Sequence, residues 1–226
     1  MTGPGPGALC RAAGPLPRLH VVTDDSMLAR GGFEARAIAV LEAGGAGVAL
    51  HLRGPRTDGS ALYRLASDLL PHARRAGTLL VVNDRLDVAL ALEVDGVHVG
   101  RRSLGVGIAR GLLGEDFWLG ASVRDAREAS AAREEGADYA FLGTMFETPT
   151  HPGRVGMGVE GLAATVGRAG GLPIVAIGGI DPARVPEVLG AGAYGVAVVR
   201  GVWDAPDAPG AVGRYRQAIE DGRETV

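Results

Sequence analysis

The chain has 226 residues, of which 46% are hydrophobic and only 4% aromatic, so we expect one domain whose core is packed mainly by Ala, Val and Leu. Its 23 basic and 26 acidic residues give a net charge of −3, which argues against nucleic acid or a membrane surface as a partner. The single cysteine, Cys10, excludes an internal disulfide framework and a cysteine-rich metal site, and a cytoplasmic location is expected.

The two ends of the chain differ from the rest. Residues 1–17 contain four glycines and four prolines and no apolar run, which predicts a flexible N-terminal tail rather than a signal peptide. The folded domain is expected over residues 18–222, followed by a short C-terminal tail at 223–226. No segment has the apolar length needed to span a bilayer.

Strand-like and helix-like segments alternate through the domain. The expected strands are 19–23, 47–52, 78–82, 96–99, 118–121, 139–142, 174–177 and 195–198. Helices are expected between them, at 33–43, 60–76, 124–135, 159–169 and 182–189, with a last helix at 210–221. Eight such units predict an α/β fold of the (β/α)₈ TIM-barrel type in a single domain. A doubly wound open sheet is the alternative, but it would place its phosphate-binding glycines after the first strand, where the sequence reads Asp24-Asp25-Ser26.

The last two expected strands both end at glycine just before a helical segment. They lie in the stretches 172–180, which ends Gly-Gly-Ile, and 195–201, which ends Arg-Gly. Glycine lets backbone N–H groups approach an anion closely, and two such turns late in a barrel are typical of a phosphate site. The alternative is that both are ordinary strand ends.

Polar and basic residues recur at the carboxyl ends of the earlier strands, where the active site of a barrel lies. Each of these residues also has a purely structural interpretation. Asp24 or Asp84 would cap a helix, and His98 would be a core histidine bonded to the backbone. Arg101 and Arg102 would be solvated charges in a loop. The functional interpretation rests on their recurrence at one end of six successive strands. The set is Thr23–Ser26, His51, Arg53, Asn83, Asp84, His98, Arg101, Arg102, Ser122 and Arg124.

One long loop, residues 143–158, is punctuated by glycine and proline. It combines the hydroxyl groups of Thr144, Thr148 and Thr150 with His151 and Arg154. Such a loop is suited to fold over a ligand and bind its oxygen atoms.

Together these stretches resemble the thiamine-phosphate synthase / TenI superfamily, from about residue 19 to residue 220. The matching segments are HVVTDDS (20–26), HLR (51–53), VVNDRLDVAL (81–90), DGVHVG (95–100), LGASV (119–123), GADY (136–139), the 143–158 loop, IGGI (177–180) and GVAVV (195–199).

The resemblance implies a barrel that binds hydroxyethylthiazole phosphate and takes part in thiamine biosynthesis. A synthase displaces pyrophosphate from an aminopyrimidine methyl pyrophosphate to form thiamine phosphate; TenI-type proteins include a thiazole tautomerase. The expected partners are therefore small-molecule substrates, and formation of a homo-oligomer is left open.

The resemblance also implies roles for individual residues. Gly179, Val199 and Arg200 would bind the thiazole phosphate through backbone N–H groups, and Asn83 would contact the pyrimidine. Asp84 would be a ligand of Mg²⁺. Residues facing the pyrophosphate would be Arg53, Ser122, Thr148 and Thr150.

The chain departs from the synthase pattern at several of these positions. His51 replaces a glutamine, Arg101 another glutamine, and Ser103 a second magnesium-binding aspartate. Lysines are replaced by Pro55 and by His151. Magnesium depends on one or two carboxylates plus phosphate oxygens, so loss of one aspartate should weaken its binding.

His51 resembles the TenI branch, but the histidine that a tautomerase would carry two residues after Ser122 is Arg124, which cannot shuttle a proton at neutral pH. Stabilising a departing pyrophosphate is electrostatic, and arginines, Arg53, Arg101, Arg102 and Arg124 among them, do this through bidentate contacts. Synthase chemistry, with Ser122, His51 and Arg53 as catalytic candidates, is therefore preferred. A tautomerase and a non-catalytic thiazole or thiamine phosphate-binding regulator remain the alternatives.

Overall fold

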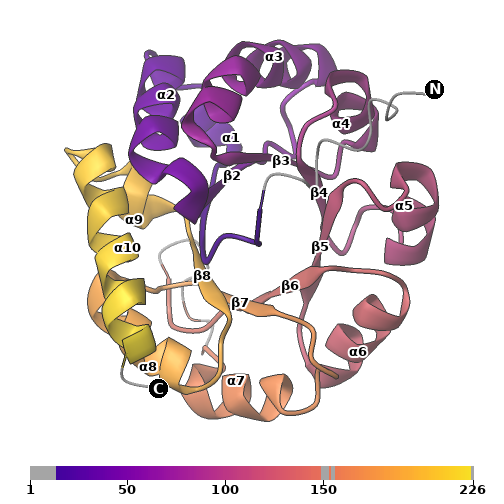
Figure 1. Ribbon diagram of the computed structural model, residues 1–226, viewed down its shortest axis with the longest axis vertical. Coiled ribbons are helices and arrows are strands. Elements are labelled where there is room, and N and C mark those ends of the chain that lie inside the picture. The colour runs from indigo at the N-terminus through magenta and orange to yellow at the C-terminus, as the bar shows by residue number, and fades with distance from the viewer. Residues whose placement is uncertain (1–13, 149–152, 154–155, 225–226) are drawn as a thin grey trace.

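Eight parallel strands close into a ring in the computed structural model, with helices covering its outside (Figure 1). The structure describes residues 14–148, 153 and 156–224. Each strand pairs in parallel with the next, and β8 pairs with β1, so the order β1 to β8 around the barrel is the order in the chain. This confirms the TIM barrel and excludes the doubly wound open sheet.

The strands lie within about a residue of their expected positions at most ends. They are β1 (Leu19–Val22), β2 (Val48–Leu52), β3 (Leu79–Asn83), β4 (Gly96–Val99), β5 (Trp118–Val123), β6 (Tyr139–Gly143), β7 (Ile174–Ile177) and β8 (Gly195–Val198). The larger helices are α2 (Phe33–Gly44), α3 (Gly59–Ala76), α4 (Leu86–Leu92), α5 (Val106–Leu113), α6 (Ala126–Glu134), α7 (Gly158–Val166), α8 (Val185–Gly190) and α10 (Ala208–Glu224).

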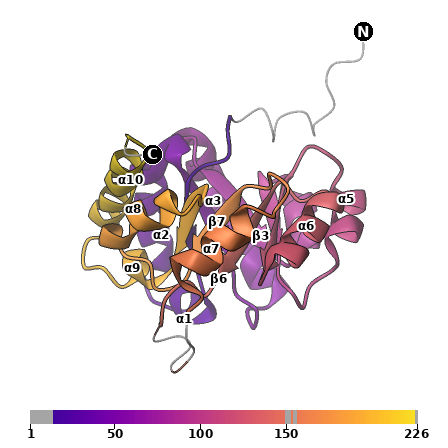
Figure 2. The same cartoon turned by 90° about the horizontal axis from the view of Figure 1, so that it is seen from below.

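Three short helical turns were not among the helices expected from the sequence. They are α1 (Asp25–Leu28), α9 (Arg200–Trp203) and η3 (Gly45–Gly47). The helix expected at 182–189 is present, but its first turn is the 3-10 helix η4 (Pro182–Arg184). Both α1 and α9 directly follow the carboxyl end of a strand, and Figure 2 shows α1 at the lower end of the barrel. These turns therefore shape the mouth of the barrel at that end.

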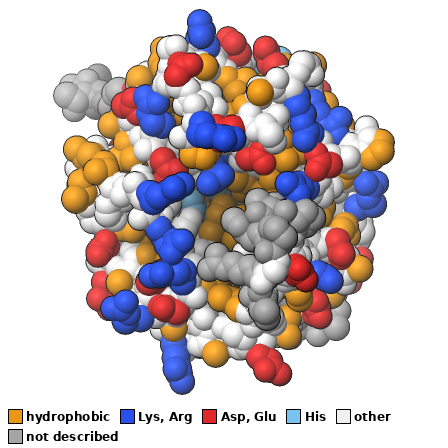
Figure 3. Space-filling view, turned by 180° about the vertical axis from the view of Figure 1, so that it is seen from behind, with side chains coloured by type: hydrophobic (Ala, Val, Ile, Leu, Met, Phe, Trp, Pro, Cys, Tyr) orange, Lys and Arg blue, Asp and Glu red, His pale blue; other side chains and the backbone are white. Residues whose placement is uncertain are grey.

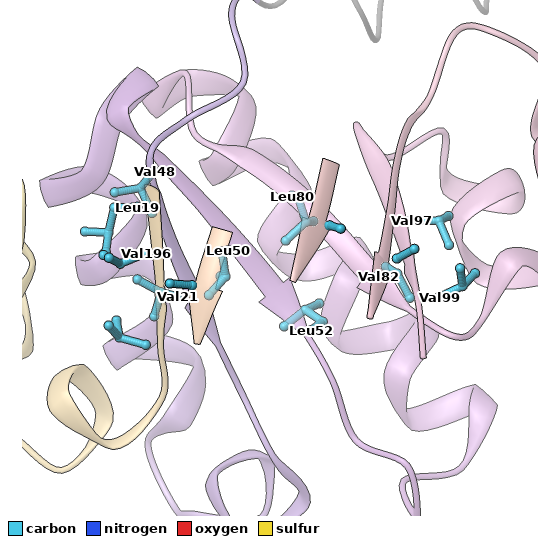
Figure 4. Packing of buried hydrophobic residues seen from close by; sticks show 14 of the residues in the cluster. Leu19, Val21, Val48, Leu50, Leu52, Leu80, Val82, Val97, Val99 and Val196 are labelled. Carbon is cyan, nitrogen blue, oxygen red and sulfur yellow. The ribbon is translucent and has the colours of Figure 1, made fainter. Parts of the chain in front are cut away.

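The main core lies between the strands and the helices. Alternate strand residues face outward and are fully buried there, because side chains alternate across a strand. Figure 4 shows this layer on four neighbouring strands and β8. Its labelled residues are Leu19, Val21, Val48, Leu50, Leu52, Leu80, Val82, Val97, Val99 and Val196. Here Leu and Val do the packing, as expected.

The inside of the barrel is packed differently. Tyr139 and Phe141 of β6 lie against three buried histidines, with the rings of His98 and Phe141 4.1 Å apart between centroids and those of His20 and Tyr139 5.2 Å apart. Inside the barrel, ring side chains therefore share the packing that was expected mainly from Ala, Val and Leu. Ring side chains fill the space that small strand residues such as Gly120 leave open.

An ion pair ties the α5–β5 turn to the start of β6. Arg110 of α5 donates to Asp138 at 2.7 Å and to the carbonyls of Gly136 and Phe117. The Asp138 carboxylate also accepts from the N–H of Leu119 at 2.8 Å. Both charged side chains are only 11% exposed, so each depends on the other for neutralisation.

The structure differs from the expected domain boundaries at both ends. Leu16 is 7% exposed and packs inside the barrel, and the Pro17 carbonyl accepts a hydrogen bond from His20, so these two residues belong to the folded domain. At the other end α10 runs on to Glu224. The predicted flexibility of residues 1–13 lies outside the described residues. Among the helices that are described, none combines the length and the apolar character that crossing a bilayer would require.

Candidate active site

A cavity of about 410 Å³ opens at the carboxyl ends of the strands. Figure 3 shows this face, with hydrophobic side chains on the floor of a central hollow and basic side chains along one edge. Seven strands contribute lining residues, and Arg53, directly after β2, adds the eighth side, so the whole mouth contributes. Of the predicted site residues it brings together Arg53, Asn83, Arg101, Ser122, Arg124, Thr148, Gly179, Val199 and Arg200.

After β7 the backbone is turned so that its carbonyls face the loop that follows β6. The carbonyl of Ile177 accepts from the N–H of Met145, and that of Gly178 from the N–H of Phe146, each at 3.0 Å. Because a trans peptide bond holds its C=O and N–H on opposite sides, the N–H groups of Gly178 and Gly179 point away from that loop. Both glycines line the cavity, and neither N–H donates to a backbone carbonyl within the described part of the chain.

Arg184 fixes the orientation of the next peptide, between Gly179 and Ile180, in the same way. It donates to the carbonyl of Gly179 at 2.8 Å while its guanidinium lies over the Phe146 ring, 4.3 Å from the centroid. The N–H of Ile180, on the opposite side of that peptide, therefore points away from Arg184. Glycine is required at 179, because φ is +68° and a Cβ would lie 2.8 Å from the carbonyl oxygen of Glu147. We call the N–H groups of 178, 179 and 180 the N–H row.

The turn after β8 lies beside the N–H row, because β7 and β8 are paired neighbours. Val199 and Arg200 line the cavity, and α9 begins at Arg200. The first N–H groups of a helix have no partner within it and carry a partial positive charge. Both glycine-ended turns thus present backbone donors to the same cavity.

The charged side chains at the cavity are mainly basic. Arg53, Arg101, Arg124 and Arg200 line it, and Asp24 is the acidic side chain among the described lining residues. All 23 basic residues of the chain are arginines. The mouth is therefore suited to anions, and its positive charge comes from guanidinium groups.

Not all predicted arginines are equally available. Arg124 is exposed but paired with Glu128, to which its Nε donates at 2.8 Å. Arg102 is exposed and is absent from the described lining of the cavity. Arg53 is half-buried and Arg101 is exposed, and both line the cavity, so these two are better placed than Arg102 and Arg124 to contact an anion there.

His51, a catalytic candidate, lies beneath the cavity. It is 0% exposed and absent from the described lining, because it points into the barrel between His20 and Asn83. Burial lowers the pKa of His51 to about 3, and burial followed by the proximity of His51 holds the pKa of His20 well below its usual value. Both rings are therefore neutral at physiological pH, and His51 does not reach a ligand in the cavity.

His98 and Ser122 form a pair at the cavity floor. His98 Nε2 lies 2.9 Å from Ser122 Oγ, so His98 is not the backbone-bonded core histidine of the alternative interpretation. Burial lowers the pKa of His98 well below its usual value, so the ring is neutral. Gly120 leaves space for it: a Cβ there would lie 2.5 Å from both His98 Nδ1 and the Tyr139 hydroxyl oxygen.

Asp84 does not cap α4; the N-cap residue is Arg85, without a side-chain bond. Asp84 Oδ1 instead accepts from the N–H of Gly100 at 2.7 Å, with the backbone of Asp84 in the left-handed region at φ 64°. It lies at the carboxyl end of β3 but outside the described lining of the cavity. No group of three or more His, Cys, Asp or Glu suited to a metal is found among the described residues.

Other expectations have mixed outcomes. Asp24 does cap a helix, accepting from the N–H of Met27 at 3.0 Å, as its structural alternative predicted. Ser103 is half-buried and is not among the described lining residues.

Thr150 and His151 lie outside the described residues, and their predicted contacts stay predictions. The pairing of His20 with His51 was missed; a polar residue inside an otherwise apolar β1 was the available signal.

Comparisons with known proteins agree with this geometry. The family model for thiamine monophosphate synthase matches residues 19–202. The chain is 40% identical to thiamine-phosphate synthase from Chloroflexus aurantiacus over 92% of this chain and 94% of that one. It is 44% identical, over 78% of its length, to the thiamine biosynthesis bifunctional protein ThiM/ThiE from Symbiobacterium thermophilum, but spans only 36% of that longer protein.

A solved structure gives the same result. The thiamine phosphate pyrophosphorylase from Pyrococcus furiosus superposes with a TM-score of 0.78 at 32% identity, over 91% of this chain and 96% of that one. Matches in sequence and in structure thus both extend over nearly the whole barrel. The chain belongs to the thiamine monophosphate synthase (TMP-TENI) family.

Proposed function

We propose that this protein is a thiamine-phosphate synthase, which joins hydroxyethylthiazole phosphate to an aminopyrimidine methyl pyrophosphate with release of pyrophosphate. The observation that carries the proposal is the N–H row. Three successive peptides have their carbonyls bonded on one side, and their N–H groups, which make no backbone hydrogen bond within the described residues, lie on the opposite side beside a cavity with a basic rim. Such a row suits a phosphate monoester, and full-length relatives are synthases.

In the bond-changing step the C–O bond of the pyrimidine methylene breaks, and its electron pair leaves with the pyrophosphate. The lone pair of the thiazole nitrogen forms the new C–N bond, and the ring becomes a thiazolium cation. No proton is transferred in that step. The demand on the protein is therefore electrostatic, and Arg53, Arg101 and the Ser122 hydroxyl are suited to stabilise the leaving group.

The donor set fits magnesium only as an ion bound mainly by substrate. Asp84 Oδ1 is engaged by Gly100, which leaves Oδ2 as the protein ligand. Magnesium commonly combines one or two carboxylates with phosphate oxygens and water. When bound there, it would neutralise charge on the pyrophosphate.

A tautomerase is less well supported. It needs a side chain that exchanges a proton with its substrate, but His51 is buried beneath the cavity and Arg124 is paired with Glu128. His98 lines the cavity, yet its Nε2 is engaged by Ser122. These contacts favour ionic stabilisation over proton transfer.

The test is an incubation of the protein with both synthase substrates, with and without Mg²⁺, followed by chromatography for thiamine phosphate and pyrophosphate. Equal amounts of the two products are expected with Mg²⁺ present. A matched pair of variants, Arg53→Gln at the cavity and Arg75→Gln on the outer surface of α3, separates the site from general charge loss. No product at high enzyme concentration would refute the proposal.

A further inference from the structure

A chain of hydrogen bonds crosses the inside of the barrel from the segment before β1 to the cavity. His20 Nε2 lies 3.0 Å from the carbonyl oxygen of Pro17, and His20 Nδ1 lies 2.8 Å from His51 Nε2. His51 Nδ1 in turn lies 3.2 Å from the Asn83 carboxamide. All three side chains are buried, and of the three only Asn83 is among the described residues that line the cavity.

The first contact sets the direction of donation along this chain. A carbonyl oxygen can only accept, so His20 Nε2 must carry the hydrogen that Pro17 receives. A neutral imidazole has one N–H, so His20 Nδ1 is an acceptor and His51 Nε2 donates to it. His51 Nδ1 is then left without a hydrogen and must accept from Asn83.

The opposite direction is unfavourable. It would place a lone pair of His20 Nε2 against a lone pair of the Pro17 carbonyl, unless His20 or His51 were an imidazolium. Burial disfavours the cation at both positions, as the lowered pKa values show. Two neutral rings that both carry hydrogen on Nε2 satisfy every contact.

This direction decides how the Asn83 carboxamide is turned. The structure has Asn83 Oδ1 facing His51 Nδ1, where two acceptors would meet. Half a turn about the Cβ–Cγ bond exchanges oxygen and nitrogen and moves no other atom. Nδ2 then donates to His51, and the carbonyl oxygen takes the other position, which makes no hydrogen bond within the described part of the chain and borders the cavity.

We propose that His20 and His51 are positioning residues that hold Asn83 with its carbonyl oxygen toward the cavity, so that this corner of the site selects a ligand bearing an N–H donor. Resting on the proposed function, that donor is the exocyclic amino group of the aminopyrimidine. His51, although out of reach of the ligand, thereby affects which ring is accepted.

The first test needs no substrate. Long-range ¹H–¹⁵N NMR correlations distinguish a histidine with hydrogen on Nε2 from one with hydrogen on Nδ1 or on both nitrogens. His51→Gln identifies the signals of His51, and His72→Gln, on the outer helix α3, serves as a matched control. Hydrogen on Nε2 alone is expected for both His20 and His51 at neutral pH. Hydrogen on Nδ1 of either ring would overturn the proposal.

The second test uses kinetics of the whole enzyme. Gln at 51 can accept from Asn83 and donate to His20, so His51→Gln should keep the pyrimidine KM within about threefold of the wild-type value. Leucine at 51 can neither accept from Asn83 nor donate to His20. In His51→Leu the loss of one oriented hydrogen bond should therefore raise the pyrimidine KM about tenfold and leave the thiazole phosphate KM unchanged. Equal effects of His51→Gln and His51→Leu would contradict a positioning role.

A substrate analogue in which the amino group is replaced by hydrogen sharpens the comparison. The wild-type enzyme should prefer the amino compound about tenfold, and His51→Leu should lose most of that preference. An unchanged preference in His51→Leu would refute the assignment. If no variant, nor the wild type, forms thiamine phosphate, the proposed function fails, and the NMR result still decides how the hydrogen-bond chain is directed.

Discussion

Replacing Gly179 by alanine tests the N–H row directly. A Cβ at this position would lie 2.8 Å from the carbonyl oxygen of Glu147 and 2.9 Å from Phe146 Cβ, in a backbone with φ of +68°. Contacts under 3.0 Å force the peptide or its neighbours to move. The Gly179 N–H would then be displaced from the position in which it meets a phosphate.

The magnitude follows from two separate costs. The left-handed backbone costs an L-residue about 1–2 kcal/mol of folding stability. Loss of one hydrogen bond to a charged phosphate costs about 1.5–3 kcal/mol of binding, so the KM for thiazole phosphate should rise by about 10- to 150-fold. The pyrimidine KM should stay within about threefold, because its contacts lie across the cavity.

Gly32→Ala is the matched control. Gly32 has φ of +76° at the N-cap of α2, and a Cβ there meets nothing within 4 Å. It should lose similar folding stability, measured by urea denaturation, without any change in either KM. Equal thiazole phosphate KM values for Gly179→Ala and Gly32→Ala would show that the N–H row does not bind the phosphate.

Three further predictions follow from the contacts described above. Arg110→Ala should lower the free energy of unfolding by about 3–5 kcal/mol, because Asp138 would remain buried without its cation. Urea denaturation measures this loss, with Arg75→Ala as the control. A loss below about 1 kcal/mol would contradict the prediction. The pKa values of His20 and His51 are lower in the folded than in the unfolded chain, so below about pH 6.5 the unfolded chain binds more protons. The contribution of the two histidines to the free energy of unfolding is therefore complete above about pH 6.5. It should be lost as the pH falls toward the folded-state pKa values, near 3 for His51. Urea denaturation between these limits should show a slope smaller by about 1.4 kcal/mol per pH unit in His51→Gln, and an unchanged slope would refute the assignment. Asp84→Asn should raise the Mg²⁺ concentration for half-maximal activity about tenfold with little loss of stability, and an unchanged magnesium titration would exclude Asp84 as a ligand.

The sequence predicts the barrel well because its signals are local. Most strands are largely apolar runs that begin or end near glycine, and the four residues of Ile174–Ile177 and of Gly195–Val198 match the expected ranges. The turns after these two strands were predicted to bind phosphate, and both line the cavity. A glycine pair directly after a strand, such as Gly178-Gly179, is easily recognised in a sequence, because it usually marks a turn whose backbone needs positive φ or a close approach to a ligand.

The interior of the barrel was less predictable. His51 sits at the carboxyl end of β2 like Arg53, and a period of two places both on the inner face, but it does not say how deep each lies. The structure buries His51 completely and leaves Arg53 at the mouth. Asp84 shows the same limit, because its partner, the N–H of Gly100, lies just after the next strand, β4, and is 16 residues away in sequence. Contacts between strands decide such positions.

The absence of lysine has a consequence for how ligand affinity varies with acidity. The positive charge at the mouth comes from guanidinium groups, which in proteins stay protonated at any pH near neutral. Backbone amides do not titrate either. Within the described lining of the cavity, a change in thiazole phosphate affinity near pH 6 is therefore expected from the second ionisation of the ligand's own phosphate, which makes this protein a convenient host for measuring how much a dianion gains over a monoanion.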